Sequence, residues 1–381
     1  MLLSFFYIKK EQNLNLRNKI NRVITAILKI LSTNKYSKMK KSIAIIFMFY
    51  LFGILSCSES PIEEKIDPPG FGIDPQTYPC PYLEPSVSFD GSKILFYRAK
   101  VKRISKGGYN TEFDPDSTGF WVCNIDGSNM RLIYNNSFDN ISNPQFTPNM
   151  GEIVFVKNAQ ICKAKYNGTT IGEDDIEQLT FEGRNFFPSI SNDGNSVAFS
   201  QSICGSVSKQ SSANFCGVII ANMSGENKEL ISKYSTAPDW HPTKQSIIFL
   251  NRAILEGGVP IGDTLWEYST QQQKRKFIAL LTNDNYDNRY AKYSPDGLNI
   301  AFTSRTDIGY QQIWLLDPTG KTKCLTAAGA YSNCSWTPTS RIVYIQYAPF
   351  NYDEKNGTIW IMDSDGGNKK QITFNHGLIL E

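Results

Sequence analysis

The apolar and polar positions of this chain repeat six times in the same order. Each copy has a small residue or proline, a spacer, an apolar residue, a short polar turn and an apolar run that ends in Phe or Tyr. The copies read PSVSFDGSKILF, PQFTPNMGEIVF, PSISNDGNSVAF, PDWHPTKQSIIF, AKYSPDGLNIAF and CSWTPTSRIVY. They end at Phe96, Phe155, Phe199, Phe249, Phe302 and Tyr344, about 50 residues apart on average. Such a period is typical of stacked units that cannot bury their apolar faces alone.

Each copy predicts two antiparallel strands joined by a tight turn, because turn residues such as Asp-Gly separate its two apolar runs. A third strand is predicted in GFWVCNIDG, AQICKAKYNG, GVIIANMSG, TLWEYST, QIWLLDPTG and TIWIMDSDG. A fourth follows in short runs such as IEQLTF and FIALLT. The third strand carries Trp at one recurring position (Trp121, Trp266, Trp314 and Trp360), which favours packing between units over ligand stacking.

Four strands in each of six units predict an all-β fold, a six-bladed β-propeller of four-stranded antiparallel blades over residues 81–381. The phrase P-x-apolar-[ST]-P-D-G-x-x-[IV]-A-F, clearest from Ala291 to Phe302, resembles the repeat of TolB-like six-bladed propellers. The resemblance covers about residues 82–377 and implies the fold. It leaves the function open, because similar blades occur in Tol-system proteins, peptidase accessory domains and polysaccharide lyases. TolB proteins also carry an α/β domain before the propeller, for which Cys57 to Tyr82 offers no counterpart.

An export signal is predicted at residues 39–56. Met39 is followed by two lysines, an apolar run from Ile43 to Leu55 and a small residue, a pattern too short for a comfortable membrane span. The sequence Ile-Leu-Ser-Cys resembles a bacterial lipobox, which implies lipidation of Cys57 and a cell-envelope, outer-membrane location. An uncleaved anchor is the alternative. Residues 1–38 do not fit an export signal, so we expect translation to begin at Met39.

Removal of this leader reverses the charge of the chain. The full sequence has 39 basic and 36 acidic residues, but residues 1–56 hold ten of the basic and one of the acidic ones. The mature chain therefore has a net charge of about −6, which gives no support for nucleic-acid binding. Residues 57–80 are rich in Pro, Gly and acids and predict a flexible tether. Its early acidic group, Glu59, Glu63 and Glu64, resembles the surface-export signals of some Bacteroidetes lipoproteins.

Eight cysteines in an exported chain make disulfides possible. Cys204 and Cys216 flank a polar loop between neighbouring strands and are the favoured pair. Cys324 and Cys334 are a second, less favoured pair. Cys123 and Cys162 are expected to be buried, inert thiols.

No catalytic motif, metal site or cofactor site is predicted. The chain has two histidines, His241 and His376, so it cannot supply the histidine cluster that holds the metal in uronate-cleaving propellers. His241 replaces the Ser or Thr of the fourth repeat, which favours a structural role. The acidic stretches at Asp114–Gly119 and Asp363–Gly366 loosely resemble calcium loops but lack the terminal glutamate.

The connections between second and third strands are long in blades one, three, four and six, and they emerge on one face of a propeller. Long connections on one face favour a surface that binds a protein or a glycan, although tolerated insertions would look the same. Its predicted residues are Lys100, Lys102, Arg103, Lys106, Tyr109, Phe350 and Tyr352.

The sequence thus favours a membrane-anchored, non-catalytic binding or scaffolding module. One alternative is a polysaccharide-active enzyme that uses loop acids such as Asp114, Glu256 or Asp353. Another is a Tol-like periplasmic assembly factor.

Overall fold

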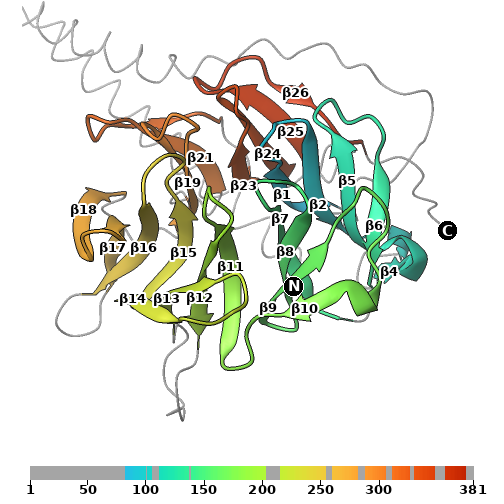
Figure 1. Ribbon diagram of the computed structural model, residues 1–381. Coiled ribbons are helices and arrows are strands. Elements are labelled where there is room, and N and C mark those ends of the chain that lie inside the picture. The colour runs from blue at the N-terminus through green and yellow to red at the C-terminus, as the bar shows by residue number, and fades with distance from the viewer. Residues whose placement is uncertain are drawn as a thin grey trace, which may run out of the picture. The chain divides into compact units, whose positions relative to one another are not determined.

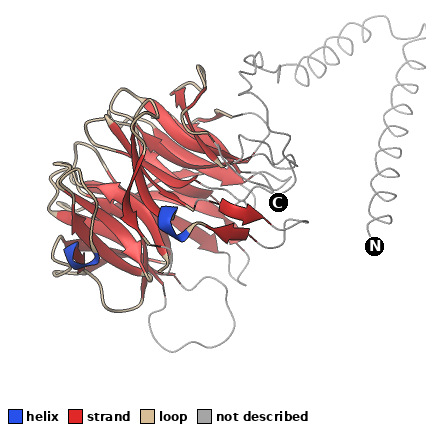
Figure 2. Cartoon of the chain, turned by 90° about the vertical axis from the view of Figure 1, so that its right-hand side faces the viewer, coloured by secondary structure: helices blue, strands red, loops and turns tan. Residues whose placement is uncertain are grey.

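The computed structural model describes residues 82–99, 101–104, 111–136, 139–202, 215–254, 260–281, 288–305, 311–326, 330–347 and 357–374. These residues form six four-stranded antiparallel sheets, one small hairpin and two single-turn 3-10 helices (Figures 1 and 2). The predicted six-bladed propeller is therefore confirmed.

The first three blades are built as follows. Blade 1 contains β1 (Tyr82–Val87), β2 (Lys93–Arg98), β5 (Gly119–Asn124) and β6 (Arg131–Asn135). Blade 2 contains β7 (Ile141–Phe146), β8 (Glu152–Lys157), β9 (Gln160–Lys165) and β10 (Ile176–Gln178). Blade 3 contains β11 (Arg184–Ile190), β12 (Ser196–Ser202), β13 (Phe215–Asn222) and β14 (Glu229–Lys233). The hairpin β3 (Val101–Ile104) and β4 (Thr111–Phe113) with η1 (Pro115–Ser117) lies between β2 and β5 in sequence, and η2 (Glu173–Asp175) precedes β10.

The other three blades repeat this order. Blade 4 contains β15 (Ser235–Trp240), β16 (Ser246–Ile254), β17 (Pro260–Ser269) and β18 (Lys274–Leu280). Blade 5 contains β19 (Asn288–Tyr293), β20 (Ile300–Arg305), β21 (Gln311–Leu316) and β22 (Thr322–Cys324). Blade 6 contains β23 (Ala330–Trp336), β24 (Arg341–Tyr347), β25 (Thr358–Asp363) and β26 (Lys370–Gln371).

The first strand of each blade lies innermost. Each of these six strands contacts the first strands of both neighbouring blades, and β1 and β23 close the circle (Figure 1). Blade 6 uses four consecutive strands, whereas in blade 1 the hairpin of β3 and β4 intervenes between β2 and β5 in sequence. The seam between blades 1 and 6 is closed by side chains, with hydrogen bonds from Tyr82 Oη to the Phe374 carbonyl (3.0 Å) and from Val87 N to Ser335 Oγ (3.1 Å).

The apolar core consists of six clusters, one between each pair of adjacent blades. The aromatic residues that close the repeated phrase are fully buried in these clusters: Phe96, Phe155, Phe199, Phe249, Phe302 and Tyr344. The four recurring Trp side chains are half-buried and pack against the same clusters, as their position predicted. A blade therefore buries its faces only by contact with its neighbours, which explains the repeat of the sequence.

The buried cysteines include both thiols that were expected to be inert. Burial raises the pKa of Cys123 to about 12 and that of Cys162 to about 11, so both stay protonated near neutral pH. The second disulfide candidate, Cys324 with Cys334, is wrong, because Cys334 carries a free thiol. Cys334 lies in the cluster between blades 5 and 6, while the Cys324 thiol donates to the Thr326 carbonyl at 3.1 Å.

The recurring pattern of the first turn follows from its hydrogen bonds. The hydroxyl of the repeated Ser or Thr accepts a backbone N–H from the start of the second strand, as in Lys93 N to Ser88 Oγ (2.9 Å) and Asn299 N to Ser294 Oγ (2.9 Å). In blades 1, 3 and 5 an aspartate two residues on accepts from that hydroxyl, as in Ser294 Oγ to Asp296 Oδ1 (2.5 Å). These contacts fix the hairpin without any ligand.

In blade 4 an imidazole takes the place of the hydroxyl as the side-chain acceptor of the first turn. His241 is buried, and its Nδ1 accepts from the backbone N–H groups of Thr243 and Lys244, each at 3.1 Å. Gly297 of the next blade has φ +69°, and a Cβ there would lie 2.4 Å from His241 Nε2, so only glycine fits. The structural role expected for His241 agrees with these contacts.

Replacing Phe249 by Ala should destabilise the propeller by about 3–5 kcal/mol, because the change empties a fully buried site between blades 3 and 4. Phe181, which is 73% exposed, offers a matched control, and Phe181→Ala should change stability by about 0.5 kcal/mol or less. Thermal unfolding of both variants checks this. Equal losses would contradict the interblade core.

The substitution His241→Ser should make the folded state less sensitive to acid. Burial, followed by the charge of Lys244, lowers the pKa of His241, so the folded state favours the neutral ring. A depressed pKa contributes stability above the unfolded value of about 6.5, and that stability is lost as the pH falls through the folded value. Serine can accept the same backbone N–H groups and does not titrate. Melting temperatures between pH 7.5 and pH 5 should therefore fall less steeply in His241→Ser than in the wild type or in His376→Ser.

Candidate binding cavity on the propeller axis

A cavity of about 380 Å³ lies among the six innermost strands. Its lining comes from six equivalent segments, residues 84–89, 143–146, 187–192, 237–242, 290–295 and 333–338. Because all six blades contribute, the cavity lies on the propeller axis. The lining includes first-turn residues such as Phe89, Pro242 and Pro295, so it reaches the face of the short turns.

Each innermost strand carries a bulge that directs one residue to this cavity. The pairing register between first and second strands shifts once in every blade. At each shift one residue adopts a left-handed φ between 50° and 55°: Glu84, Asn143, Phe187, Ala237, Tyr290 and Asn333. A left-handed φ is uncommon outside glycine, and a bulge re-aims the side chain that it carries. These six residues, named here the bulge ring, all line the cavity.

The bulge ring has two chemically different halves. The adjacent blades 6, 1 and 2 contribute Asn333, Glu84 and Asn143, which form a polar half. Blades 3, 4 and 5 contribute Phe187, Ala237 and Tyr290. The rings of Phe187 and Tyr290 meet edge to face with centroids 5.9 Å apart, although one blade separates them in the circle. The small Ala237 side chain between them permits this contact.

Glu84 carries the one carboxylate of the bulge ring. Its Oε2 accepts a hydrogen bond from the backbone N–H of Asn143 on the next blade. Enclosure by the protein raises the pKa of Glu84 to about 7, even though the hydrogen bonds from Asn143 act in the opposite direction. Among the described side chains, no cation forms an ion pair with Glu84.

A second level of side chains ties neighbouring blades together along the cavity wall. Lys292 of blade 5 donates to Asp239 of blade 4 at 2.9 Å, and the Tyr293 backbone N–H donates to the other Asp239 oxygen at 2.9 Å. Ser189 accepts from the Trp240 backbone N–H at 3.2 Å. The charge of Asp239 is therefore satisfied within the wall, in contrast to that of Glu84.

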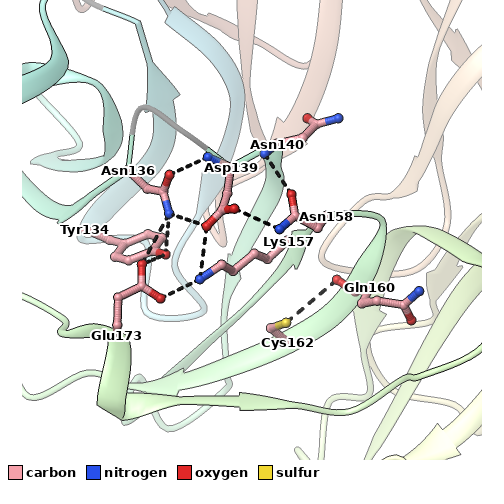
Figure 3. A network of polar contacts seen from close by, with 9 residues as sticks. All are labelled: Tyr134, Asn136, Asp139, Asn140, Lys157, Asn158, Gln160, Cys162 and Glu173. Carbon is pink, nitrogen blue, oxygen red and sulfur yellow. Dashed lines mark hydrogen bonds and ion pairs between the residues drawn. The ribbon is translucent and has the colours of Figure 1, made fainter.

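Another polar cluster fastens the seam between blades 1 and 2 (Figure 3). Lys157 Nζ lies 2.5 Å from Glu173 Oε2 and 3.2 Å from Asp139 Oδ2. Tyr134 Oη donates to Glu173 at 2.7 Å, and Asn136 donates to Asp139 at 2.8 Å. Burial opposes the charge of Lys157, but its contacts with Glu173, Tyr134 and Asp139 together raise its pKa. Each charge here meets its complement, which identifies a structural tie and leaves no open site.

Asp114 and Asp363, from the two stretches that loosely resemble calcium loops, accept hydrogen bonds from neighbouring residues of the chain. Asp114 Oδ1 accepts from the Asp116 backbone N–H at 3.1 Å, which caps η1. Asp363 accepts from Arg341 at 2.9 Å and from Asn368 at 2.6 Å. In the described parts of the chain, no group of three or more potential ligands could hold a metal ion. No helix in those parts is both long and apolar enough to cross a bilayer.

None of the site residues predicted from the sequence belongs to the described lining of the cavity. Those that lie outside the described residues are Cys57, Lys100, Lys106, Tyr109, Cys204, Glu256, Phe350, Tyr352 and Asp353. Lys102 and Arg103 in β3 and Cys216 in β13 lie in described strands, but their side chains lie outside the description. The roles of all these residues stay predictions.

Sequence reasoning missed the bulge ring. The available signal was the position before the repeated phrase, since Glu84, Asn143, Phe187 and Ala237 each precede its proline. The residue types at this position differ from blade to blade, so no motif drew attention to it.

No protein-family model matches the chain, and no curated protein matches it. Among solved structures, TolB from Acinetobacter baumannii is 20% identical with a TM-score of 0.55, over 74% of this chain and 63% of that one. A protein from Agrobacterium tumefaciens named as TolB is 19% identical with a TM-score of 0.52, over 64% and 84%. The tricorn protease is 18% identical with a TM-score of 0.51, over 78% and 26%.

These likenesses concern the fold, and they include both TolB and a protease. The chain spans less than two thirds of the length of the Acinetobacter protein. The same blades thus serve proteins of different activity, and the site has to decide the function. The described part of the chain is a TolB-like six-bladed β-propeller.

Proposed function

We propose that this chain is a cell-envelope lipoprotein whose propeller binds a partner through its axial cavity without catalysing a reaction. The observation that carries the proposal is the cavity itself, which combines a polar half and an aromatic half on six rigid strands. A concave site of a few hundred Å³ with few, well-placed polar groups is typical of ligand binding. The long-loop face predicted from the sequence would then be a second contact surface for a protein or a glycan.

The anchor in this proposal is lipid on Cys57, supported by the pattern of residues 39–57. Residues 57–80 would act as a tether, which at about 3.3–3.6 Å per residue spans up to roughly 80 Å. That reach lets the propeller meet partners well away from the bilayer. The acidic group Glu59, Glu63 and Glu64 supports display on the surface in the manner of Bacteroidetes lipoproteins.

A catalytic function is supported less well. Glycoside hydrolysis uses two carboxyl groups that flank the scissile bond. Of the described carboxylates in the cavity lining, Asp239 is held by Lys292 and a backbone N–H, which leaves Glu84 alone. Of the loop acids considered for polysaccharide chemistry, Asp114 caps a helix. A Tol-like assembly role remains the second candidate, favoured by the fold alone.

Replacing Cys57 by Ser should remove the lipid and release the protein from membranes. We expect the wild type to incorporate an alkyne-labelled fatty acid and to sediment with the membrane fraction. Cys57→Ser should lose the label and appear in the soluble fraction. Cys80→Ser, a change in the same tether, should behave as the wild type does. A label that persists in Cys57→Ser would contradict lipidation at this residue.

A photo-reactive benzoylphenylalanine at the cavity mouth should trap the partner. Phe89 lines the cavity and is 41% exposed, whereas Phe277 on the outer strand of blade 4 is 49% exposed and lies away from the cavity lining. Irradiation of cells should give a discrete adduct from position 89 and none from position 277. Absence of an adduct at position 89, or the same adduct at both, would contradict binding through the cavity.

A further inference from the structure

We propose that the axial cavity takes a cationic group, a primary ammonium or a guanidinium joined to an apolar stem, with Glu84 as its counter-charge. This inference rests on the proposed binding function and names the chemistry of its ligand. The cation could belong to a small free amine or to a Lys or Arg side chain projecting from a partner.

The first support is the charge balance of the cavity lining. Its described charged side chains are Glu84, Asp239 and Lys292. Asp239 and Lys292 form an ion pair at 2.9 Å and neutralise each other. An ionised Glu84 therefore leaves this lining with one negative charge. An enclosed charge without a partner is costly, and a cation that enters the cavity removes that cost.

The second support is the geometry around Glu84. Asn143 and Asn333 are its two neighbours in the bulge ring, one on each side along the circle. Asn143 N–H already binds one carboxylate oxygen and orients the group. An ammonium has three donors and a guanidinium five, and both need several acceptors at once. A carboxylate with an Asn at each neighbouring position of the ring offers several acceptors, and hydrogen bonds to an ionised group are the strong ones.

The third support is the apolar half of the bulge ring. Phe187 and Tyr290 lie across the ring from Glu84 and present an aromatic wall. Such a wall suits the methylene stem of an amine and also attracts a cation through its ring faces. Neither half alone selects an amphipathic amine, but together they match its two ends. The cavity is too small for a folded domain, so one projecting group enters it.

The titration of Glu84 adds a pH dependence. With the pKa of Glu84 near 7, cation binding must favour the ionised form, so affinity falls as the pH drops below about 7. The other titratable side chains that line or adjoin the cavity include Tyr97, Asp239, Lys292 and His241. Burial, followed by the charge of Glu84, raises the pKa of Tyr97, and burial, followed by the charge of Lys244, lowers the pKa of His241. Asp239 is paired with Lys292.

Calorimetric titration of the full mature protein with matched probes tests the inference. Hexylamine and hexanol differ in the charged group, and so do acetyl-lysine and acetyl-norleucine methylamides. We expect each cation to bind the wild type at least tenfold more tightly than its neutral match at pH 8, with the difference shrinking by pH 6. Glu84→Gln, which keeps the shape and an acceptor for Asn143 N–H, should abolish the preference. Glu177→Gln, at an exposed acid on the outer strand β10, should retain it.

The outcomes distinguish a free amine from a projecting side chain, and they distinguish failure of the cation inference from failure of the proposed binding function. Preference for hexylamine alone indicates a free amine, and preference for the lysine derivative alone indicates a projecting side chain. If neither cation is preferred, or if a folded Glu84→Gln protein keeps the preference, the inference is wrong. A persisting adduct at position 89 would then leave the proposed binding function intact, whereas its loss would remove that function as well. Thermal unfolding of Glu84→Gln verifies that the variant is folded.

Discussion

Burial between neighbouring blades is the interaction on which this structure depends. Each sheet has apolar faces that no other part of its own blade covers, and six clusters bury them around the ring. The aromatic residue that closes each repeated phrase is fully buried at these contacts. Because every blade needs both neighbours, the ring forms as a unit. The same packing fixes the separation of the six inner strands and thereby leaves an enclosed space between them.

The sequence was sufficient to predict the fold, for physical reasons that particular residues show. Phe199 and Phe302 recur because each blade needs a large apolar side chain at the same contact. Ser88 and Ser294 recur because a hydroxyl at that place satisfies the backbone of a tight turn. Positions of this kind serve the same purpose in every blade, so selection for packing makes them periodic. Periodicity is readable without coordinates.

The candidate site could not be predicted, because its residue types are not periodic in the sequence. The residues of the bulge ring have the same backbone conformation but different side chains, among them Glu84, Phe187 and Asn333. What matters there is the combination around the circle, which depends on the order and number of blades. The two halves of the cavity exist only once the chain has closed, because Asn333 and Glu84 become neighbours at the seam of blades 6 and 1. Long loops attracted attention in the sequence, whereas the cavity is formed by regular strands.

The bulges have a consequence for how such a protein can change. At these six positions the backbone presents a side chain towards the axis, yet the chain already tolerates an acid, amides, aromatic rings and a methyl group in that conformation. Specificity is therefore partly separable from folding: a single codon can alter what the interior recognises while the buried aromatic residues that close the repeated phrases stay untouched. Duplicated genes of this architecture could diverge in selectivity quickly, and a designer could rewrite the interior one position at a time.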